Sequence, residues 1–152
     1  MNIMKGNLIE LAKEGKFDVI IHGCNCFCAM GAGIAKAIKA EFPEAYEADC
    51  RTIKGDRAKL GDITYAHSEK GGHQLTVVNG YTQYNFRGRK PLVDYDAVRS
   101  VFSKVRELFS GKRIAYPKIG AGLAGGDWDI IEKIINEELH NEDHTLVVFS
   151  PS

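Results

Sequence analysis

Two glycine-rich segments carry the residues of this sequence that are best suited to chemistry. The first is Met30-Gly31-Ala32-Gly33, and the second runs from Lys118 to Gly126. Glycine lets the backbone turn sharply and approach a ligand closely. Each segment follows a short apolar run and precedes a helical pattern, so each is expected to present free backbone N–H groups at the positive end of a helix dipole. Such a position binds anions, and phosphate is the usual occupant.

Neither segment matches a more specific phosphate-binding motif. Lys36 stands where G-x-G-x-x-G requires its third glycine, and the Gly-Lys-Ser/Thr of a P-loop is missing. By itself, the first pair of glycines is also consistent with a close turn between a strand and a helix. The second segment favours a ligand, because two such loops beyond the carboxyl ends of strands can hold a diphosphate from both sides. The pattern indicates a nucleotide or sugar-nucleotide ligand.

The cysteines are the other group of residues with chemical potential. Cys24, Cys26 and Cys28 alternate along the chain after His22, and Cys50 stands apart. Structural zinc sites use C-x2-C spacing and a matching pair of Cys or His, neither of which occurs here. A catalytic cysteine needs a base and a lowered pKa, which the sequence does not show. We therefore expect no metal and no cofactor, and small cysteines packed in a tight turn.

Length and charge limit the function classes further. The chain has 152 residues, so a single domain over residues 1–152 is expected. Lys and Arg number 20 and Asp and Glu number 20, and a net charge of zero argues against general nucleic-acid binding. No segment approaches the roughly 20 apolar residues of a membrane span, and no signal peptide is evident. We expect a cytoplasmic protein without a membrane partner.

Strand and helix patterns alternate along the whole chain, which predicts an α/β fold with a largely parallel sheet. The segment 54–59 is predicted to be a solvated loop. The segment 81–90 is predicted to be a loop whose aromatic and arginine side chains either cover a nucleotide or are simply exposed. The predicted strands are 2–4, 17–21, 63–66, 75–79, 113–117 and 145–149. The predicted helices are a short one near Leu11 and Ala12 that ends at Gly15, and others near 34–42, 43–46, 94–110 and 127–135.

Three stretches, in this order along the chain, resemble a macro domain, the fold that binds ADP-ribose. They are Gly6-Asn7-Leu8-Ile9, then His22 to Asn25 with Met30 to Ala35, then Pro117 to Leu123. The resemblance implies a three-layer α/β sandwich, with a mixed, largely parallel sheet between helices. The similar subgroup includes ADP-ribose 1″-phosphate phosphatases, terminal ADP-ribose-protein hydrolases and a DNA ADP-ribose-removing antitoxin.

The resemblance also implies positions for the ligand. Residues near Leu8 and Ser150 would lie at the adenine end, the two glycine loops would hold the diphosphate and the distal ribose, and Asn25 would lie near that ribose. The ligand-binding residues implied in this way are Asn7, Leu8, Ile9, Asn25, Met30, Gly31, Ala32, Gly33, Ile34, Lys118, Ile119, Gly120, Ala121, Gly122, Leu123, Ala124 and Ser150.

Three positions depart from the family pattern. Asn7 replaces the aspartate that accepts a hydrogen bond from the adenine amine. The loop after the 75–79 strand has no lysine before Lys90, although the protein- and DNA-acting hydrolases use a lysine there to form a covalent sugar adduct. Ala124 replaces the aspartate that assists that lysine. A Schiff-base mechanism of that kind is not expected here.

Cleavage of the terminal phosphate of ADP-ribose 1″-phosphate is then the leading hypothesis. In this hypothesis Asp127 activates a water, His22 protonates the leaving oxygen and Asn25 lies beside the phosphate. Loop N–H groups would stabilise charge on the phosphoryl oxygens. Each role has a structural alternative: Asp127 also fits a helix N-cap, and His22 also fits a side chain that satisfies a nearby carbonyl.

Other functions remain open at this stage. One is a module that binds ADP-ribose without chemistry. Another is an ester hydrolase that releases ADP-ribose from acidic side chains or acetate from O-acetyl-ADP-ribose. A third is an unrelated nucleotide enzyme without affinity for ADP-ribose. The expected partners are ADP-ribose or its 1″-phosphate, with ADP-ribosylated protein as a further candidate.

Overall fold

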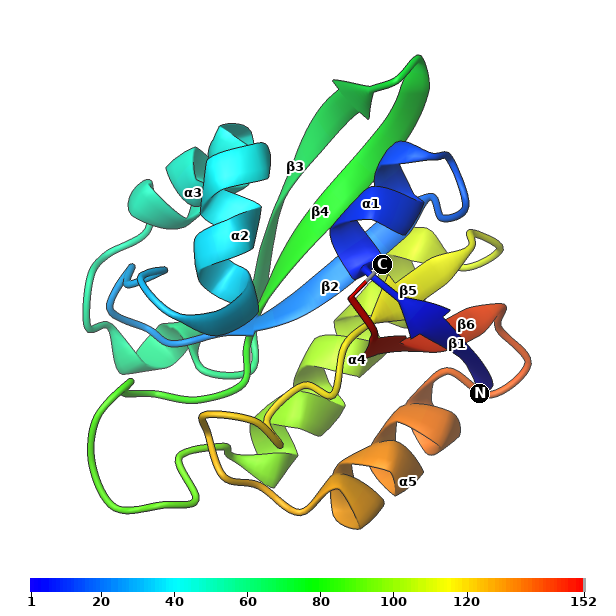
Figure 1. Ribbon diagram of the computed structural model, residues 1–152. Coiled ribbons are helices and arrows are strands. Elements are labelled where there is room, and N and C mark those ends of the chain that lie inside the picture. Colours follow the sequence, from blue (N-terminus) through cyan, green and yellow to red (C-terminus); the bar gives the residue numbers. More distant parts are fainter. Residues whose placement is uncertain (152) are drawn as a thin grey trace.

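A six-stranded sheet organises the chain, and helices cover both of its faces (Figure 1). The computed structural model describes residues 1–151. The strand order is β1-β6-β5-β2-β4-β3, and every neighbouring pair is parallel except β3 and β4. The predicted α/β fold with a mixed, largely parallel sheet is confirmed. The strands are β1 (Asn2–Gly6), β2 (Val19–Cys24), β3 (Ile63–Lys70), β4 (His73–Tyr81), β5 (Ile114–Tyr116) and β6 (His144–Phe149).

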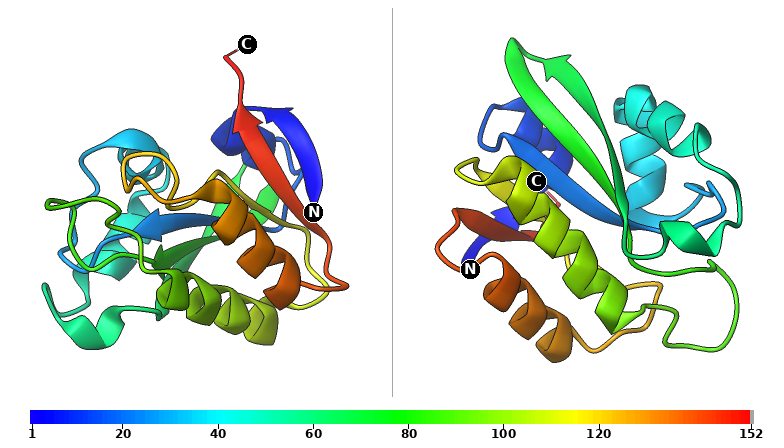
Figure 2. Two further views of the ribbon diagram at one scale, coloured as in Figure 1. Left: turned by 90° about the horizontal axis from the view of Figure 1, so that it is seen from below. Right: turned by 180° about the vertical axis from the view of Figure 1, so that it is seen from behind.

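The helices divide between the two faces, as Figures 1 and 2 show. Successive β2 residues alternate between two apolar cores: Ile21 packs in the core that contains α4 and α5, and Ile20 in the core that contains α1 and α2. No helix in the described part of the chain has the length and apolar character needed to cross a membrane. The helices are α1 (Leu8–Lys13), α2 (Gly33–Glu41), α3 (Pro43–Cys50), α4 (Tyr95–Phe109), α5 (Trp128–Glu138) and a short 3-10 helix, η1 (Arg57–Lys59).

Side-chain oxygens close the N-termini of most helices. Asn7, Asp94 and Asp127 cap α1, α4 and α5, each through a side-chain oxygen that accepts a hydrogen bond from a first-turn N–H group. The predicted cap at Asp94 is confirmed. The N-cap of α2 is Ala32, which has no side-chain acceptor to offer. That helix therefore begins with its N–H groups unsatisfied by a cap.

The prediction of a solvated loop over residues 54–59 was wrong at its end. Lys59 belongs to η1 and is only 7% exposed. Its Nζ donates a hydrogen bond of 2.7 Å to Thr52 Oγ1 and lies 5.2 Å from the centre of the Tyr81 ring. A lysine stem is apolar enough to be buried when its ammonium finds an acceptor and an aromatic face.

Gly80 provides a test of how closely α4 packs on the sheet. A Cβ at this β4 position would lie 2.7 Å from Val101 Cγ1, and the β-branched Val101 side chain has little freedom to move. Gly80→Ala should therefore lower the free energy of unfolding by about 1–3 kcal/mol, measured by urea denaturation. Gly122→Ala is the matched control, because nothing lies within 4 Å of its Cβ position. Equal stability of the two variants would contradict this packing.

Candidate functional site

A cavity of ≈ 480 Å³ lies beyond the carboxyl ends of β2 and β5, where the two glycine segments meet. Both segments leave the same end of the sheet, as the ribbons in Figures 1 and 2 show. This volume is within the range of small-molecule sites. The lining residues are Gly23, Cys24, Asn25, Ala29, Gly31, Ala32, Gly33, Ile34, Ala35, Gln83, Phe86, Leu92, Pro117, Lys118, Ile119, Gly120, Gly122, Leu123 and Ala124.

The N-terminus of α2 forms one wall of the cavity. Gly33, Ile34 and Ala35 all line it, and their N–H groups have no backbone acceptor within residues 1–151. Gly33 has φ +58°, a left-handed conformation that glycine adopts without strain. The first turn carries no acidic residue that would compete with an anion. This wall therefore offers N–H donors and the positive end of a helix dipole.

The second glycine segment forms the opposite wall. It folds back on itself, because the Gly126 N–H donates to Gly120 O at 2.7 Å and the Gly125 N–H donates to Gly122 O at 3.0 Å. A Cβ at Gly120 would lie 2.6 Å from Val93 Cγ2, so no larger residue fits there without a shift. Gly122 faces open space. The two walls leave a narrow, backbone-lined space suited to a diphosphate.

Asn25 shapes the loop between the walls. Its Oδ1 accepts a hydrogen bond of 2.8 Å from the Phe27 N–H, and its Nδ2 donates one of 2.9 Å to Ala29 O. The side chain is 7% exposed and lines the cavity. An amide nitrogen carries two hydrogens, so one donor remains for a ligand. Asn25 thus both fixes the loop and supplies a polar group.

The structure brings most of the implied binding residues together, but not all of them. Those that line the cavity are Asn25, Gly31, Ala32, Gly33, Ile34, Lys118, Ile119, Gly120, Gly122, Leu123 and Ala124. Met30 is buried behind the loop, where it packs with Cys26 and Tyr81. The remaining implied residues that lie outside the cavity are Asn7, Leu8, Ile9, Ala121 and Ser150, together with the catalytic candidates His22 and Asp127.

Comparison with known proteins places the chain in a family. A family model described as Macro domain matches residues 21–135. The chain belongs to the macro domain family. A 17.5 kDa protein of Enterobacteria phage T4 is 35% identical over 97% of this chain and 96% of its own length.

Relatives with described activities are more distant from this macro domain. An ADP-ribose 1″-phosphate phosphatase of Debaryomyces hansenii is 28% identical over 88% of this chain and 91% of its own length. A DNA ADP-ribosyl glycohydrolase of Mycobacterium tuberculosis is 25% identical over 89% of this chain, which spans only 39% of that protein. Among solved structures, Thermosipho africanus DarTG in complex with ADP-ribose is similar to this chain with a TM-score of 0.74. The match covers 98% of this chain and 41% of that one at 17% identity, so it shows similarity of fold alone.

His22 of this macro domain, the expected general acid, does not line the cavity. The side chain is 1% exposed, and its Nε2 lies 2.7 Å from Asn79 Oδ1. Burial lowers the pKa of His22 to about 4, although the hydrogen bond with Asn79 opposes this shift. A buried imidazole that is neutral at pH 7 and satisfied by an amide is a structural group.

Asp127 also lies outside the cavity lining. It is exposed, and its Oδ1 accepts a hydrogen bond of 2.9 Å from the Asp129 N–H at the start of α5. Cys24 and Lys118 are the ionisable residues among the lining residues. Burial raises the pKa of the Cys24 thiol well above its usual range, which keeps the thiol protonated. The walls of the cavity therefore present no carboxylate or imidazole in this structure.

The implied adenine end forms a separate group at the edge of the sheet. Asn7 accepts hydrogen bonds from the Ile9 and Glu10 N–H groups, so its side chain is occupied as the cap of α1. The Ser150 N–H donates to Gly6 O at 2.9 Å, which brings the C-terminal segment beside the start of α1. Phe149, paired with Gly6 in the sheet register, is 71% exposed. Sequence reasoning missed this aromatic side chain.

Gln83, Phe86 and Leu92 also line the cavity and were not named individually from the sequence. Gln83 and Phe86 lie in the segment 81–90, which was predicted to be a loop that either covers a nucleotide or is simply exposed, and Leu92 lies just beyond it. A cis Lys90–Pro91 peptide bond lies just before Leu92. The Leu92 N–H donates to Ala124 O at 2.7 Å, which ties this loop to the second glycine segment. The aromatic residues of this loop were the sequence signal for a ligand-binding role. Which of its side chains face the cavity depends on the contact between Leu92 and Ala124.

The neutral state of His22 can be tested by titration. Its pKa of about 4 in the folded state lies below the usual value of 6.5, so the unfolded chain takes up the proton first. The contribution of His22 to stability should be constant well above pH 6.5 and fall between pH 6.5 and 4, by about 3 kcal/mol at pH 4. The pKa of His144 is also lowered to about 4 by burial, so its contribution falls in the same range. NMR of the histidine ring protons should show His22 titrating near pH 4. Titration of His22 near pH 6.5 in the folded protein would contradict its burial.

Proposed function

We propose that this macro domain binds ADP-ribose in the cavity. The observation that carries the proposal is the pairing of an uncapped helix N-terminus with a glycine loop across a cavity of ≈ 480 Å³. Two facing sets of backbone N–H groups suit a diphosphate, which carries charge on both sides. The apolar lining residues Phe86, Leu92 and Leu123 suit the carbon face of a ribose ring.

The adenine group has a plausible place at the sheet edge in this proposal. Exposed Phe149 offers an aromatic face for stacking, and the backbone of Ser150 lies beside Gly6. The side chain of Asn7 is already hydrogen-bonded as a cap, so it offers adenine less than a free carboxylate would. We therefore assign affinity mainly to the diphosphate and the ribose, and expect weaker discrimination between purine bases.

The uncapped start of α2 gives a sharp test. Ala32 is exposed and has extended backbone angles, which suit an N-cap residue. In Ala32→Asp the new carboxylate would accept hydrogen bonds from the first-turn N–H groups and place a negative charge where the diphosphate binds. We expect the variant to be more stable by about 0.5–2 kcal/mol and to bind ADP-ribose at least about tenfold more weakly by calorimetry.

Ala32→Asp is expected to gain stability while it loses ADP-ribose affinity, so weaker binding could not be attributed to unfolding of the variant. Ala40→Asp is the matched control, because it introduces the same charge at the exposed C-terminal end of α2. It should leave ADP-ribose affinity unchanged and slightly reduce stability, because a negative charge is unfavourable at that end of a helix. Full ADP-ribose affinity in Ala32→Asp would remove the α2 N-terminus from the binding site.

Hydrolysis of ADP-ribose 1″-phosphate is the reaction that we propose for this site. The support is a phosphatase relative matched over nearly its whole length, in contrast to the DNA ADP-ribosyl glycohydrolases, which are matched over 39% of theirs. Phosphoryl transfer proceeds through a loose transition state, so positioning and charge stabilisation account for most of its catalysis. Loop N–H groups and the free Nδ2 hydrogen of Asn25 would stabilise the phosphoryl oxygens. No step in this proposal uses His22.

Asn25 and Asp127 can be compared directly by phosphate release. Asn25→Asp retains the acceptor for the Phe27 N–H but removes the Nδ2 donor and adds a negative charge near the phosphate. Its turnover should fall about 100-fold. Asp127→Asn retains the cap of α5 and should keep its turnover, because Asp127 does not line the cavity. A large loss of turnover in Asp127→Asn would return this carboxylate to the mechanism as the base.

A binding module without catalysis is the second candidate. The absence of carboxylate and imidazole groups among the lining residues favours it. It predicts calorimetric binding of ADP-ribose and of its 1″-phosphate with no release of inorganic phosphate. That result would direct the next assays to ADP-ribosylated protein and O-acetyl-ADP-ribose, the substrates of the ester-hydrolase alternative.

A further inference from the structure

Positive charge gathers beside the cavity, although the chain as a whole is neutral. We call this surface the basic rim and define it as segments 51–59 and 84–92. Asp56 is the sole acidic residue in the two segments. Their Lys and Arg residues are Arg51, Lys54, Arg57, Lys59, Arg87, Arg89 and Lys90, and all of them except Lys59 are exposed.

Aromatic contacts hold the two segments of the basic rim together. The Tyr84 hydroxyl donates a hydrogen bond of 2.7 Å to Gly55 O, and the Arg57 guanidinium lies 3.8 Å from the centre of the Tyr84 ring. Phe27 packs edge-on against Tyr84 and Phe86, with ring centres 5.0 and 6.2 Å apart. The rim is thus an ordered surface that combines cations with aromatic rings.

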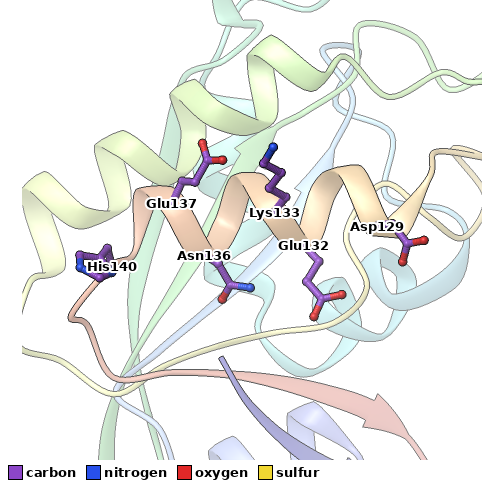
Figure 3. A pocket seen from close by; sticks show the side chains of 6 residues that line it. All are labelled: Asp129, Glu132, Lys133, Asn136, Glu137 and His140. Atoms are coloured by element: carbon purple, nitrogen blue, oxygen red, sulfur yellow. The ribbon is translucent and has the colours of Figure 1, made fainter.

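The cations of the basic rim form no ion pair within residues 1–151, whereas five cations elsewhere do, namely Lys13, Arg99, Lys104, Arg106 and Arg113. Arg99, for example, pairs with Glu137 and Glu138. The outer face of α5 shows the contrast in Figure 3, where Lys133 stands among Asp129, Glu132 and Glu137. Carboxylates outnumber the lysine on that face, whereas the two segments of the rim carry seven cations and one carboxylate and so retain a positive field.

The basic rim continues directly into the cavity. Phe86 and Leu92 belong to both surfaces. The Lys90 stem lies against the second glycine loop, because a Cβ at Gly125 would be 3.0 Å from Lys90 Cδ. Figures 1 and 2 show the 84–92 segment at the same end of the molecule as the two glycine loops. A partner on the rim would therefore reach the mouth of the cavity.

We infer that the basic rim binds single-stranded nucleic acid. Unpaired arginines at 87 and 89 suit backbone phosphates, and Phe86, with 43% of its surface exposed, offers a ring on which an unpaired base can stack. A duplex hides the faces of its bases, so an exposed aromatic ring favours a single strand over a duplex. The neutral net charge argues against general nucleic-acid binding, and the rim is a local exception to it. This inference does not depend on the identity of the ligand in the cavity.

Fluorescence anisotropy with a labelled oligothymidylate of about 12 nucleotides tests this surface. We expect binding at low salt that weakens as salt rises, with a slope of log K against log salt of about −0.7 for each phosphate neutralised. The triple variant Lys54→Glu/Arg87→Glu/Arg89→Glu should bind at least about tenfold more weakly, with a slope shallower by about 2. Lys133→Glu, on the mixed-charge face of α5, is the matched control and should bind normally.

Calorimetry on the same samples separates this inference from the proposed function. The three reversed residues do not line the cavity, so the triple variant should retain the ADP-ribose affinity of the parent protein. Failure of the parent to bind ADP-ribose would sink the proposed function and leave the rim inference standing. The rim inference is overturned if the oligonucleotide does not bind at low salt, or if Lys133→Glu loses as much affinity as the triple variant. Equally tight binding of a duplex or of polyglutamate would also overturn it, the latter in favour of an acidic protein partner.

Discussion

An unsatisfied helix N-terminus is the constraint around which this structure is arranged. The first N–H groups of a helix have no partner inside it, and a missing cap costs about 1 kcal/mol. The chain solves this problem with Asn or Asp at α1, α4 and α5, whereas α2 and α3 have no side-chain cap. The start of α2 lines a cavity. In the proposed function the diphosphate would supply the missing acceptors, so that the local instability of this helix end would contribute to affinity for a phosphate.

A buried polar network holds that open helix in place. His22 bonds to Asn79, Asn79 donates to Thr64 and to the Ala45 carbonyl, and the Tyr81 hydroxyl donates to Asp49 at 2.7 Å. These bonds tie the ends of β2 and β4 to α3, which packs beside α2. Burial raises the pKa of Asp49 despite the hydrogen bond from Tyr81. His22, a catalytic candidate from the sequence, therefore belongs to a buried polar network beside the wall of the site.

The difference between His22 and Asn25 shows what the sequence could and could not predict. Apolar runs and glycine loops were enough for the α/β fold and for the meeting of the two loops, because both depend on local patterns and on the parallel connection of strands. The direction of a side chain at the end of a strand depends on the neighbouring strand, here on Asn79 of β4. The burial of Lys59 depends in the same way on Tyr81, which is distant in sequence. Contacts between residues that are distant in the sequence cannot be predicted from the spacing of residues along the chain.

The distribution of charge could not be predicted from the sequence composition either. Net charge is a sum over the whole chain, whereas the fold can gather residues of one sign on one part of the surface. Exposed ion pairs contribute little to stability, typically less than 1 kcal/mol, so the unpaired cations of the basic rim cost the fold little. Stability therefore does not require acidic residues beside these cations, and Asp56 is the one acidic residue in the two segments of the rim. The fold does determine which segments are neighbours. The Leu92–Ala124 hydrogen bond joins the rim to the cavity wall, and the Tyr84–Gly55 hydrogen bond joins the two segments of the rim. A neutral chain thereby carries a positive surface beside a cavity that the uncapped start of α2 lines.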